Sequence, residues 1–385
     1  MYAILDEDGD LVDVEKSLHA AESSASRVAG RGRGFYVDAP EHDYTPNEAL
    51  LDIRPSSMPQ KAFQATGLNG GRPVTWRDLQ NVTDGFNDFR HVHKVLKPFF
   101  PKIEVYSTPV LMAKAFIGQN YKTSKEVEGF AGKVMGLSLA PYWKAFEPRA
   151  PVESPPRGAP NLCLGSNAEC RKACLVTSGR NIGYAAKIKF NRTRALMSYP
   201  VEFCAMLAWS MQKFFARSLN QDFRALMRLN VYSDIPWEIF FPDIFRAFPA
   251  VSLYDYSKIA HRKTPANYDL TFSYSGSNEK LARGELDRGR RVAVVFLWKR
   301  KKPFPRGFTF WGYKVVDGDI SDLRPLDPAP SIVGLRYKTP KEEHVDVADL
   351  GAFVVPVQEM DGLLVAPHSA RQSHAAEFEE HPQVG

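Results

Sequence analysis

The chain has 385 residues, of which 44% are hydrophobic and 24% are charged, as in an ordinary folded protein. No apolar run approaches the roughly eighteen residues that a membrane-spanning helix needs, and the acidic start lacks the pattern of a signal peptide. We therefore expect a cytoplasmic protein with no membrane contact. The net charge of +6 favours an anionic partner such as nucleic acid, although a solvated basic surface would give the same balance.

Residues 1–146 are predicted to form a small, mostly helical α+β region. A strand-like run covers the first twelve residues, and a helix rich in Ala, Ser and Glu is expected at 15–27. Apolar spacing over 75–135 indicates further helices, with Thr75 as an N-cap and Asp78 as its partner three residues later. His91 and His93 point in different directions on a helix, so they make a poor metal site.

Proline-rich residues 147–160 are predicted to be a linker, because proline fixes φ and removes a backbone donor. We place the main boundary there, with a second domain at 161–366. The polar segment 367–385 contains few branched apolar residues and is predicted to be a disordered tail.

Residues 161–366 alternate strand-like and helical runs. Helices are predicted at 198–219, 234–248 and 277–286, and strands at 225–231, 251–256, 268–274, 291–296, 313–317 and 331–337. Strands that alternate with helices indicate a parallel sheet, because parallel pairing needs a crossover connection. This many strands without a nucleotide-binding fingerprint favours an α/β fold that is a full or partial (β/α) barrel.

Three of the four cysteines, Cys163, Cys170 and Cys174, lie in one short motif, NLCLGSNAECRKACLVTSGR. In a reducing compartment such clustering points to metal or redox chemistry. Three thiolates can hold three irons of a [4Fe–4S] cluster and leave the fourth open, or they can join one further ligand around zinc. Cys204 lies in an apolar helix and is predicted to be a core residue. The missing fourth ligand favours the open site, and zinc remains the alternative.

Polar side chains follow successive predicted strands, where active sites of α/β barrels lie. Those nearest the cysteines in strand order are Asn230, Ser233, Asp234, Asp255, Lys258 and Ser273. Later strands end in Asp317, Asp319, Arg336 and Lys338. We take Asp234, Lys258 and Asp255 as candidate catalytic residues. The cations Lys187, Lys189, Arg192 and Arg194 are candidates for phosphate contacts or for a solvated face.

Together with the cysteine motif, the runs RLNVYSDIPWE, YDYSKIAHR, YDLTFSYSGSNE, VDGDISDLRPLD and IVGLRYK resemble a phage and plasmid family. That family is known as gene product 88, after its mycobacteriophage members, and its activity is undetermined. The resemblance covers about residues 161–356 and does not extend to the first 150 residues.

A weaker resemblance is to radical-SAM-like phage proteins related to the spore photoproduct lyase group. It implies a partial barrel with a [4Fe–4S] cluster on Cys163, Cys170 and Cys174, whose open iron binds S-adenosylmethionine. It also implies that Ser233, Asp234, Lys258 and Ser273 face the cofactor or substrate. Asn230, which follows a predicted strand, is a further candidate cofactor-binding residue. The spacing C-x6-C-x3-C, with Ala173 before the last cysteine, departs from the usual C-x3-C-x2-C of that group, in which an aromatic residue precedes the last cysteine.

Three functions follow as hypotheses. The first is an iron–sulfur, SAM-dependent enzyme that modifies a nucleic acid or nucleotide. The second is a zinc-containing, base-modifying barrel of the transglycosylase kind, with Asp234, Asp255 or Asp317 as nucleophile or base. The third is a non-catalytic DNA-binding protein stapled by a metal, whose DNA binding would be sensitive to salt.

Overall fold

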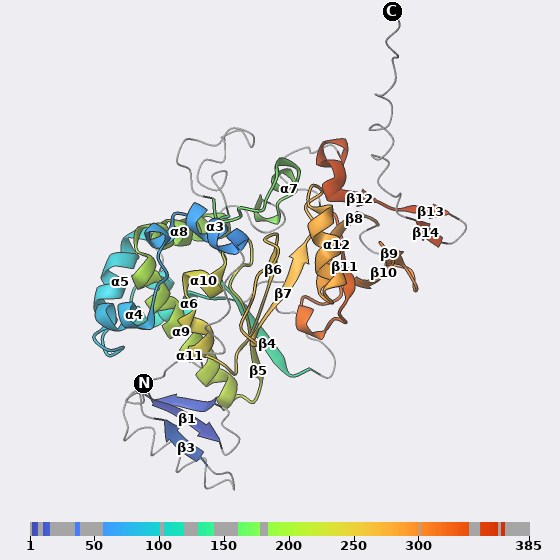
Figure 1. Cartoon of the computed structure of the whole chain (residues 1–385). Coiled ribbons are helices and arrows are strands. Elements are labelled where there is room, and N and C mark those ends of the chain that lie inside the picture. The colour runs from blue at the N-terminus through green and yellow to red at the C-terminus, as the bar shows by residue number, and fades with distance from the viewer. Residues whose placement is uncertain are drawn as a thin grey trace, which may run out of the picture.

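The structure is a computed structural model that describes residues 2–6, 11–15, 35–38, 57–100, 104–118, 130–141, 161–177, 184–299, 302–338, 347–360 and 363–365. These residues form an α/β protein in which helices pack against a nine-stranded, mostly parallel sheet (Figure 1). None of the described helices is long and apolar enough to cross a membrane. The predicted helix at 15–27, apart from Glu15, lies outside the described residues, as do the proline-rich segment and the C-terminal tail.

The strands of the large sheet are β4 (Gly132–Gly136), β5 (Arg224–Arg228), β6 (Ser252–Ser257), β7 (Tyr268–Ser273), β8 (Arg291–Leu297), β9 (Thr309–Phe310), β10 (Tyr313–Asp317), β11 (Ser331–Arg336) and β12 (Val354–Pro356). Their order is β4-β5-β6-β7-β8-β11-β10-β9, and β12 pairs with β8. All the described strand pairings of this large sheet are parallel except that of β9 with β10. The six strands predicted from the sequence are therefore confirmed as β5, β6, β7, β8, β10 and β11.

The sheet is an open path, with β4 and β9 at its two ends among the described strands. The full barrel that the sequence left possible is thus not closed by these strands. Most residues of β5 and β8 are buried, as expected where both faces of a parallel sheet are covered. At the carboxyl half of β8 the partner changes: β7 pairs with Val292 and Ala293, and β12 pairs with Val295 onward.

Strand β4 corrects the prediction that residues 75–135 are helical throughout. The run GKVMG is short and has glycine at both ends, so it carries little periodic signal. It pairs in register with β5, from Gly132 opposite Arg224 to Gly136 opposite Arg228. The first strand of the sheet therefore precedes the cysteine motif, and the motif lies on the connection from β4 to β5.

The helices are α3 (Ser57–Ala65), α4 (Trp76–Thr83), α5 (Arg90–Leu96), α6 (Pro109–Ala115), α7 (Ala168–Lys172), α8 (Tyr184–Ser198), α9 (Pro200–Asn220), α10 (Trp237–Phe240), α11 (Asp243–Ala247) and α12 (Glu279–Asp287). Short 3-10 turns are η1 (Leu68–Gly71), η2 (Lys97–Phe99), η3 (Glu104–Tyr106), η5 (Leu175–Thr177), η6 (Arg324–Leu326) and η7 (Val347–Phe353).

Helix α9 is the centre of the helical layer beside β4–β7 in Figure 1. It contacts α4, α5, α6 and α8, and an unbroken run from Phe203 to Met211 is buried. Trp209 stacks on Phe89 with ring centroids 4.1 Å apart. A helix buried on nearly all sides must be surrounded by other elements, so the helices before β4 and the sheet share one core.

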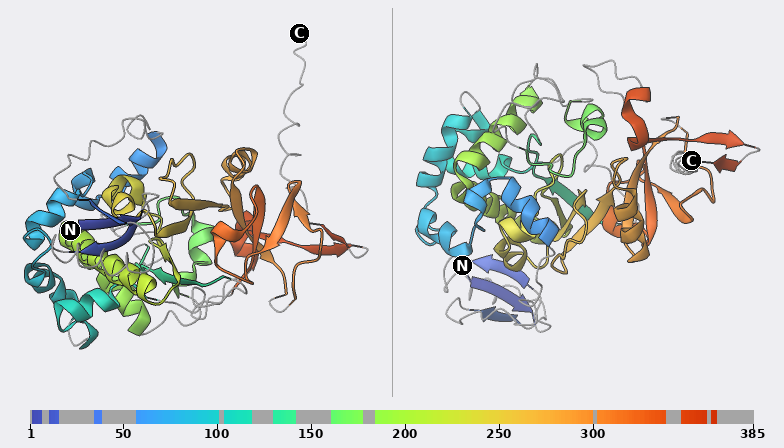
Figure 2. Two further views of the ribbon diagram at one scale, coloured as in Figure 1. Left: turned by 90° about the horizontal axis from the view of Figure 1, so that it is seen from below. Right: turned by 45° about the horizontal axis from the view of Figure 1, so that its top comes forward.

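Two small sheets complete the described chain. The first contains β1 (Tyr2–Asp6), β2 (Leu11–Glu15) and β3 (Phe35–Asp38) in the order β2-β1-β3, and the second pairs β13 (Gln358–Met360) with β14 (Leu363–Val365). Figure 2 shows the first sheet at the edge of the helical layer, where β2 contacts α9.

The predicted cap of α4 is confirmed as a capping box. The Thr75 hydroxyl accepts from the backbone N–H of Asp78 at 3.3 Å, and Asp78 Oδ2 accepts from the Thr75 N–H at 2.8 Å. We expect Thr75→Ala to lower the free energy of unfolding by about 1 kcal/mol, measured by denaturant titration. Thr75→Ser keeps the hydroxyl and should stay close to wild type; equal losses in both variants would contradict the cap.

Candidate functional site

The cysteine segment runs across the carboxyl ends of three neighbouring strands. The carbonyl of Leu162 accepts from the backbone N–H of Asp234, after β5, at 2.7 Å. Gly165 lies against Lys258, after β6: a Cβ added at Gly165 would come within 2.5 Å of the Lys258 Cβ. The amide of Asn167 donates to the carbonyl of Ser275, after β7, at 2.7 Å. The loop after β4 thereby reaches the edge at which parallel α/β sheets place their chemistry.

Helix α7, which carries Cys170, is fixed by its own first turn. Asn167 is its N-cap and accepts from the Cys170 N–H at 2.8 Å. The carboxylate of Glu169 lies against Gly276 and Gly351, where a Cβ at either position would collide with it. Gly351 has φ +48°, a conformation that favours glycine. Figure 1 shows α7 and the η7 segment side by side at one end of the strands, in agreement with their contacts.

The three cysteines of the motif form no disulfide, and their side chains differ in exposure. Cys163 and Cys170 are buried, and Cys174 is partly exposed. Burial raises the pKa of the Cys163 thiol to about 12, opposed by the charge of Lys258 and assisted by Asp234 and the other two cysteines. Lys258 responds in the opposite sense: burial lowers its pKa, but Cys170, Cys163, Asp234 and Cys174 together raise it further. The three thiols and this ammonium group therefore share one electrostatic environment.

Among the described residues, no three His, Cys, Asp or Glu side chains are arranged to hold one metal ion. A single zinc needs its sulfur ligands at about 2.3 Å, which brings the sulfurs close to one another. A [4Fe–4S] cluster places each thiolate on a different iron, so its sulfurs stand farther apart. Three cysteines from one loop are donors that either kind of centre can use.

Asp234 joins the cysteine loop to a buried ion network. Its carboxylate accepts from the Lys258 N–H at 2.7 Å and from Arg262 Nη1 at 3.3 Å. Arg262 is fully buried and donates two further hydrogen bonds to Glu238, at 2.8 and 2.6 Å. A guanidinium buried without partners is unfavourable, so Arg262 depends on these two carboxylates. Through them, Arg262 joins the segment after β6 to the segment after β5.

Asn230 and Ser233 lie in the same loop and are turned inward. Asn230 Oδ1 accepts from Ser233 Oγ at 2.9 Å, from the Ile235 N–H at 2.9 Å and from Trp237 Nε1 at 3.2 Å. Its Nδ2 donates to the Ile235 carbonyl at 2.9 Å. Asn230 therefore organises the turn that presents Asp234, and its amide is occupied by protein groups.

Asp255 is buried inside the sheet rather than at its rim. Its oxygens accept from the backbone N–H groups of Leu229 and Asn230 and from the Tyr268 hydroxyl, at 3.2, 2.9 and 2.9 Å. Burial raises the pKa of Asp255 to about 7, against the nearby Arg228 charge and these hydrogen bonds. With an exposed fraction of 0%, Asp255 has no surface to offer a substrate in this structure.

The other polar residues that were predicted at strand ends lie in two places. Ser273 ends β7 and is partly exposed, and its carbonyl accepts from Asn278 Nδ2 at 3.2 Å. Asp317, Asp319, Arg336 and Lys338 pair with one another between β10 and β11, with contacts of 2.6 to 3.2 Å. This second set is a separate ion network that satisfies its own charges.

Glu238, Glu169 and Gly165 are the site residues that the sequence reading missed. Glu238 has no motif signal, because its partner Arg262 lies 24 residues away. The Gly165 contact also depends on a distant residue, Lys258. Polarity at strand ends identified Lys258, but not Gly165, which packs against it. Such a pair of residues, distant in sequence, becomes visible only in the folded structure.

The family model that describes Gene product 88 matches residues 116–348. This is more than half of the chain. The chain belongs to the gene product 88 family. The matched region starts before β4 and ends after β11, so it contains the cysteine segment and the loops that it crosses. No curated protein and no solved structure matches the chain.

In this gene product 88 protein, Arg262 should be essential for stability. Arg262→Met leaves Asp234 and Glu238 buried without their counter-charge, which we expect to cost about 3–5 kcal/mol in the free energy of unfolding. Arg283→Met removes a comparable Arg–Glu pair, with Glu279, in which the arginine side chain is 41% exposed. That control should lose less than about 1 kcal/mol. Denaturant titration checks both, and similar losses would contradict the network.

Gly165 should be required for the placement of the thiols. In Gly165→Ala the new methyl group meets the backbone and Cβ of Lys258, so the cysteine segment must move outward. We expect faster reaction of Cys163 with a thiol reagent, followed by mass spectrometry of the labelled peptide. Gly118→Ala is the control, because a Cβ there meets nothing within 4 Å. Unchanged Cys163 labelling in Gly165→Ala would refute the contact.

Proposed function

We propose that this protein is an iron–sulfur enzyme of the radical-SAM-like kind that acts on a nucleic acid or nucleotide. The observation that carries the proposal is the position of three cysteines on one loop across the carboxyl ends of β5, β6 and β7. When bound and reduced, a [4Fe–4S] cluster with one open iron would supply the electron that splits S-adenosylmethionine into methionine and a 5′-deoxyadenosyl radical.

The residues divide into ligands and positioning groups. Cys163, Cys170 and Cys174 would hold the cluster. Cys204 is fully buried within α9, and burial raises the pKa of its thiol well above its ordinary value, so it is a poor fourth ligand. This count leaves one iron without a cysteine. Lys258 supports the thiolates with its positive charge, since an ammonium group favours the ionised form of neighbouring thiols.

Asp234 acts through its neighbours rather than on a substrate. Its backbone N–H holds the Leu162 carbonyl, and its carboxylate holds the Lys258 N–H, so one residue sets the distance between the cysteine loop and the cation. Arg262 donates to the same carboxylate and orients it. Of the predicted cofactor-binding residues, Asn230 and Ser233 are buried, whereas Ser273 at the end of β7 is partly exposed and can contact a bound molecule.

The strand order supports a partial barrel. From β4 to β8 the strands lie in chain order and run parallel, so each connection crosses in the same sense. We place the substrate at the carboxyl ends of β5, β6 and β7, which the cysteine segment crosses. The net charge of +6 is consistent with a polyanion there.

The zinc-containing alternative gains less from the described residues. Asp255 is fully buried, Asp234 is bound to Arg262, and Asp317 is bound to Arg336, so none of the proposed bases is free. A non-catalytic, metal-stapled DNA-binding protein remains the third reading, and the same metal measurements separate it from the first.

Metal content of anaerobically purified and reconstituted protein tests the proposal. We expect iron and sulfide in equal amounts, a broad iron–sulfur absorbance, and release of 5′-deoxyadenosine from S-adenosylmethionine under reducing conditions. Single alanine variants of Cys163, Cys170 and Cys174 should each lose most of the iron, whereas Cys204→Ala should keep it.

Two results would overturn the proposal. One is stoichiometric zinc without iron or sulfide in the wild-type protein, which would favour the base-modifying barrel. The other is an intact cluster that never cleaves S-adenosylmethionine, which would retain the metal site and remove the radical chemistry.

A further inference from the structure

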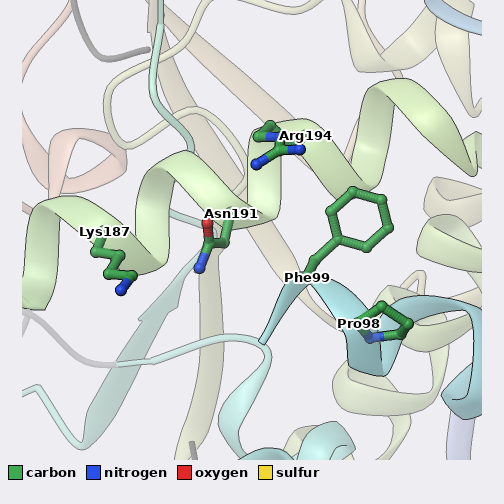
Figure 3. Close-up of a pocket in the computed structure, with 5 residues that line it drawn as sticks. All are labelled: Pro98, Phe99, Lys187, Asn191 and Arg194. Atoms are coloured by element: carbon green, nitrogen blue, oxygen red, sulfur yellow. The ribbon is translucent and has the colours of Figure 1, made fainter. Parts of the chain in front are cut away.

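A basic cavity lies on the side of α8 that faces the η2 turn. It has a volume of about 400 Å³ and is lined by Pro98, Phe99, Lys187, Asn191 and Arg194 (Figure 3). The three α8 residues are spaced by four and three positions, so they share one helix face. Pockets of this size accept small organic ligands.

Helix α8 presents its cations in two groups. Lys189 is buried and lies 5.1 Å from the ring centroid of Tyr232, and Arg192 donates to the Ala115 carbonyl at 2.7 Å and the Tyr106 hydroxyl at 2.9 Å. Those two cations are engaged with the protein. Lys187 and Arg194 are exposed and have no acidic partner among the described residues. They are the cations that remain for a ligand.

Asn191 gives the second, independent sign of a ligand. Its exposed fraction is 7%, it lines the cavity, and its side chain has no hydrogen-bond partner among the described residues. Its amide offers both donor and acceptor atoms to the cavity. A ligand with donor and acceptor atoms in the cavity would supply the missing partners.

An aromatic ring sets the chemical class of that ligand. The guanidinium carbon of Arg194 lies 6.0 Å from the centroid of the Phe99 ring, and Phe99 makes an edge contact with Tyr199. A phosphate ion alone would use the two cations and leave the ring and the amide without a role. A nucleotide uses all of them: the base stacks on Phe99, its edge meets Asn191, and its phosphate meets Lys187 and Arg194.

We propose that this cavity is a nucleotide-binding site, separate from the cysteine site, for a base and its phosphate in single-stranded nucleic acid or in a free nucleotide. Binding here does not require a cluster. As a holding point for a strand that is modified elsewhere, the site rests on the proposed function.

The cavity also joins two parts of the chain. Lys187, Asn191 and Arg194 lie within the region matched to the family, whereas Pro98 and Phe99 precede it. The helices before β4 thus contribute the stacking surface, and the family region contributes the charges.

Fluorescence anisotropy with labelled ten-residue oligothymidylate, competed by adenosine 5′-monophosphate or by inorganic phosphate, tests this site on the full chain. We expect the double variant Lys187→Ala/Arg194→Ala to bind the oligonucleotide at least about tenfold more weakly. The control Lys114→Ala/Lys280→Ala has the same change of charge at exposed positions that do not line the cavity and should bind like wild type. Phe99→Leu should lose about tenfold while keeping every cation.

The competitors identify the source of the ligand. Competition by the mononucleotide at concentrations where phosphate fails supports a nucleotide site; a preference for the oligonucleotide alone supports a strand site. Equal competition by phosphate and mononucleotide, or equal losses in the two double variants, would overturn the proposal. Iron content, measured in the same preparations, separates this failure from failure of the cysteine site.

Discussion

The hydrogen bond from the Asp234 N–H to the Leu162 carbonyl is the contact on which the arrangement of the site depends. It fixes the residue next to Cys163 to the loop after β5. The Gly165 and Asn167 contacts then continue the same segment over β6 and β7. A loop long enough to carry three thiols is normally mobile, and successive anchoring to the ends of rigid strands removes that freedom.

The anchoring has an electrostatic requirement. Bringing Asp234, Glu238 and Arg262 out of water is unfavourable unless each charge has its partners, and the geometry supplies them in full. Such a network contributes more to defining one arrangement than to net stability. The same reasoning applies to Asp255, whose hydrogen bonds hold β5, β6 and β7 in register beneath the site.

The sequence predicted the parts of the fold that depend on local pattern. Apolar runs such as Val292–Phe296 identified six strands, and the Thr75 cap identified the start of α4. Strand β4 was missed because its five residues gain strand character only from pairing with β5. Strand-end polarity selected Asp234, Lys258, Asp255 and Asn230, but not how deeply each is buried, because exposure at a strand end is a tertiary property that spacing does not report.

The packing of Glu169 against Gly276 and Gly351 has a consequence for where the folding unit ends. Gly351 lies beyond the last residue matched to the family, and Phe89, stacked on Trp209, lies before the first. A fragment trimmed to the region of similarity would therefore expose part of the α9 core and leave α7 without its neighbour. In this chain, the region that matches the family model is therefore shorter than the unit whose side chains pack together.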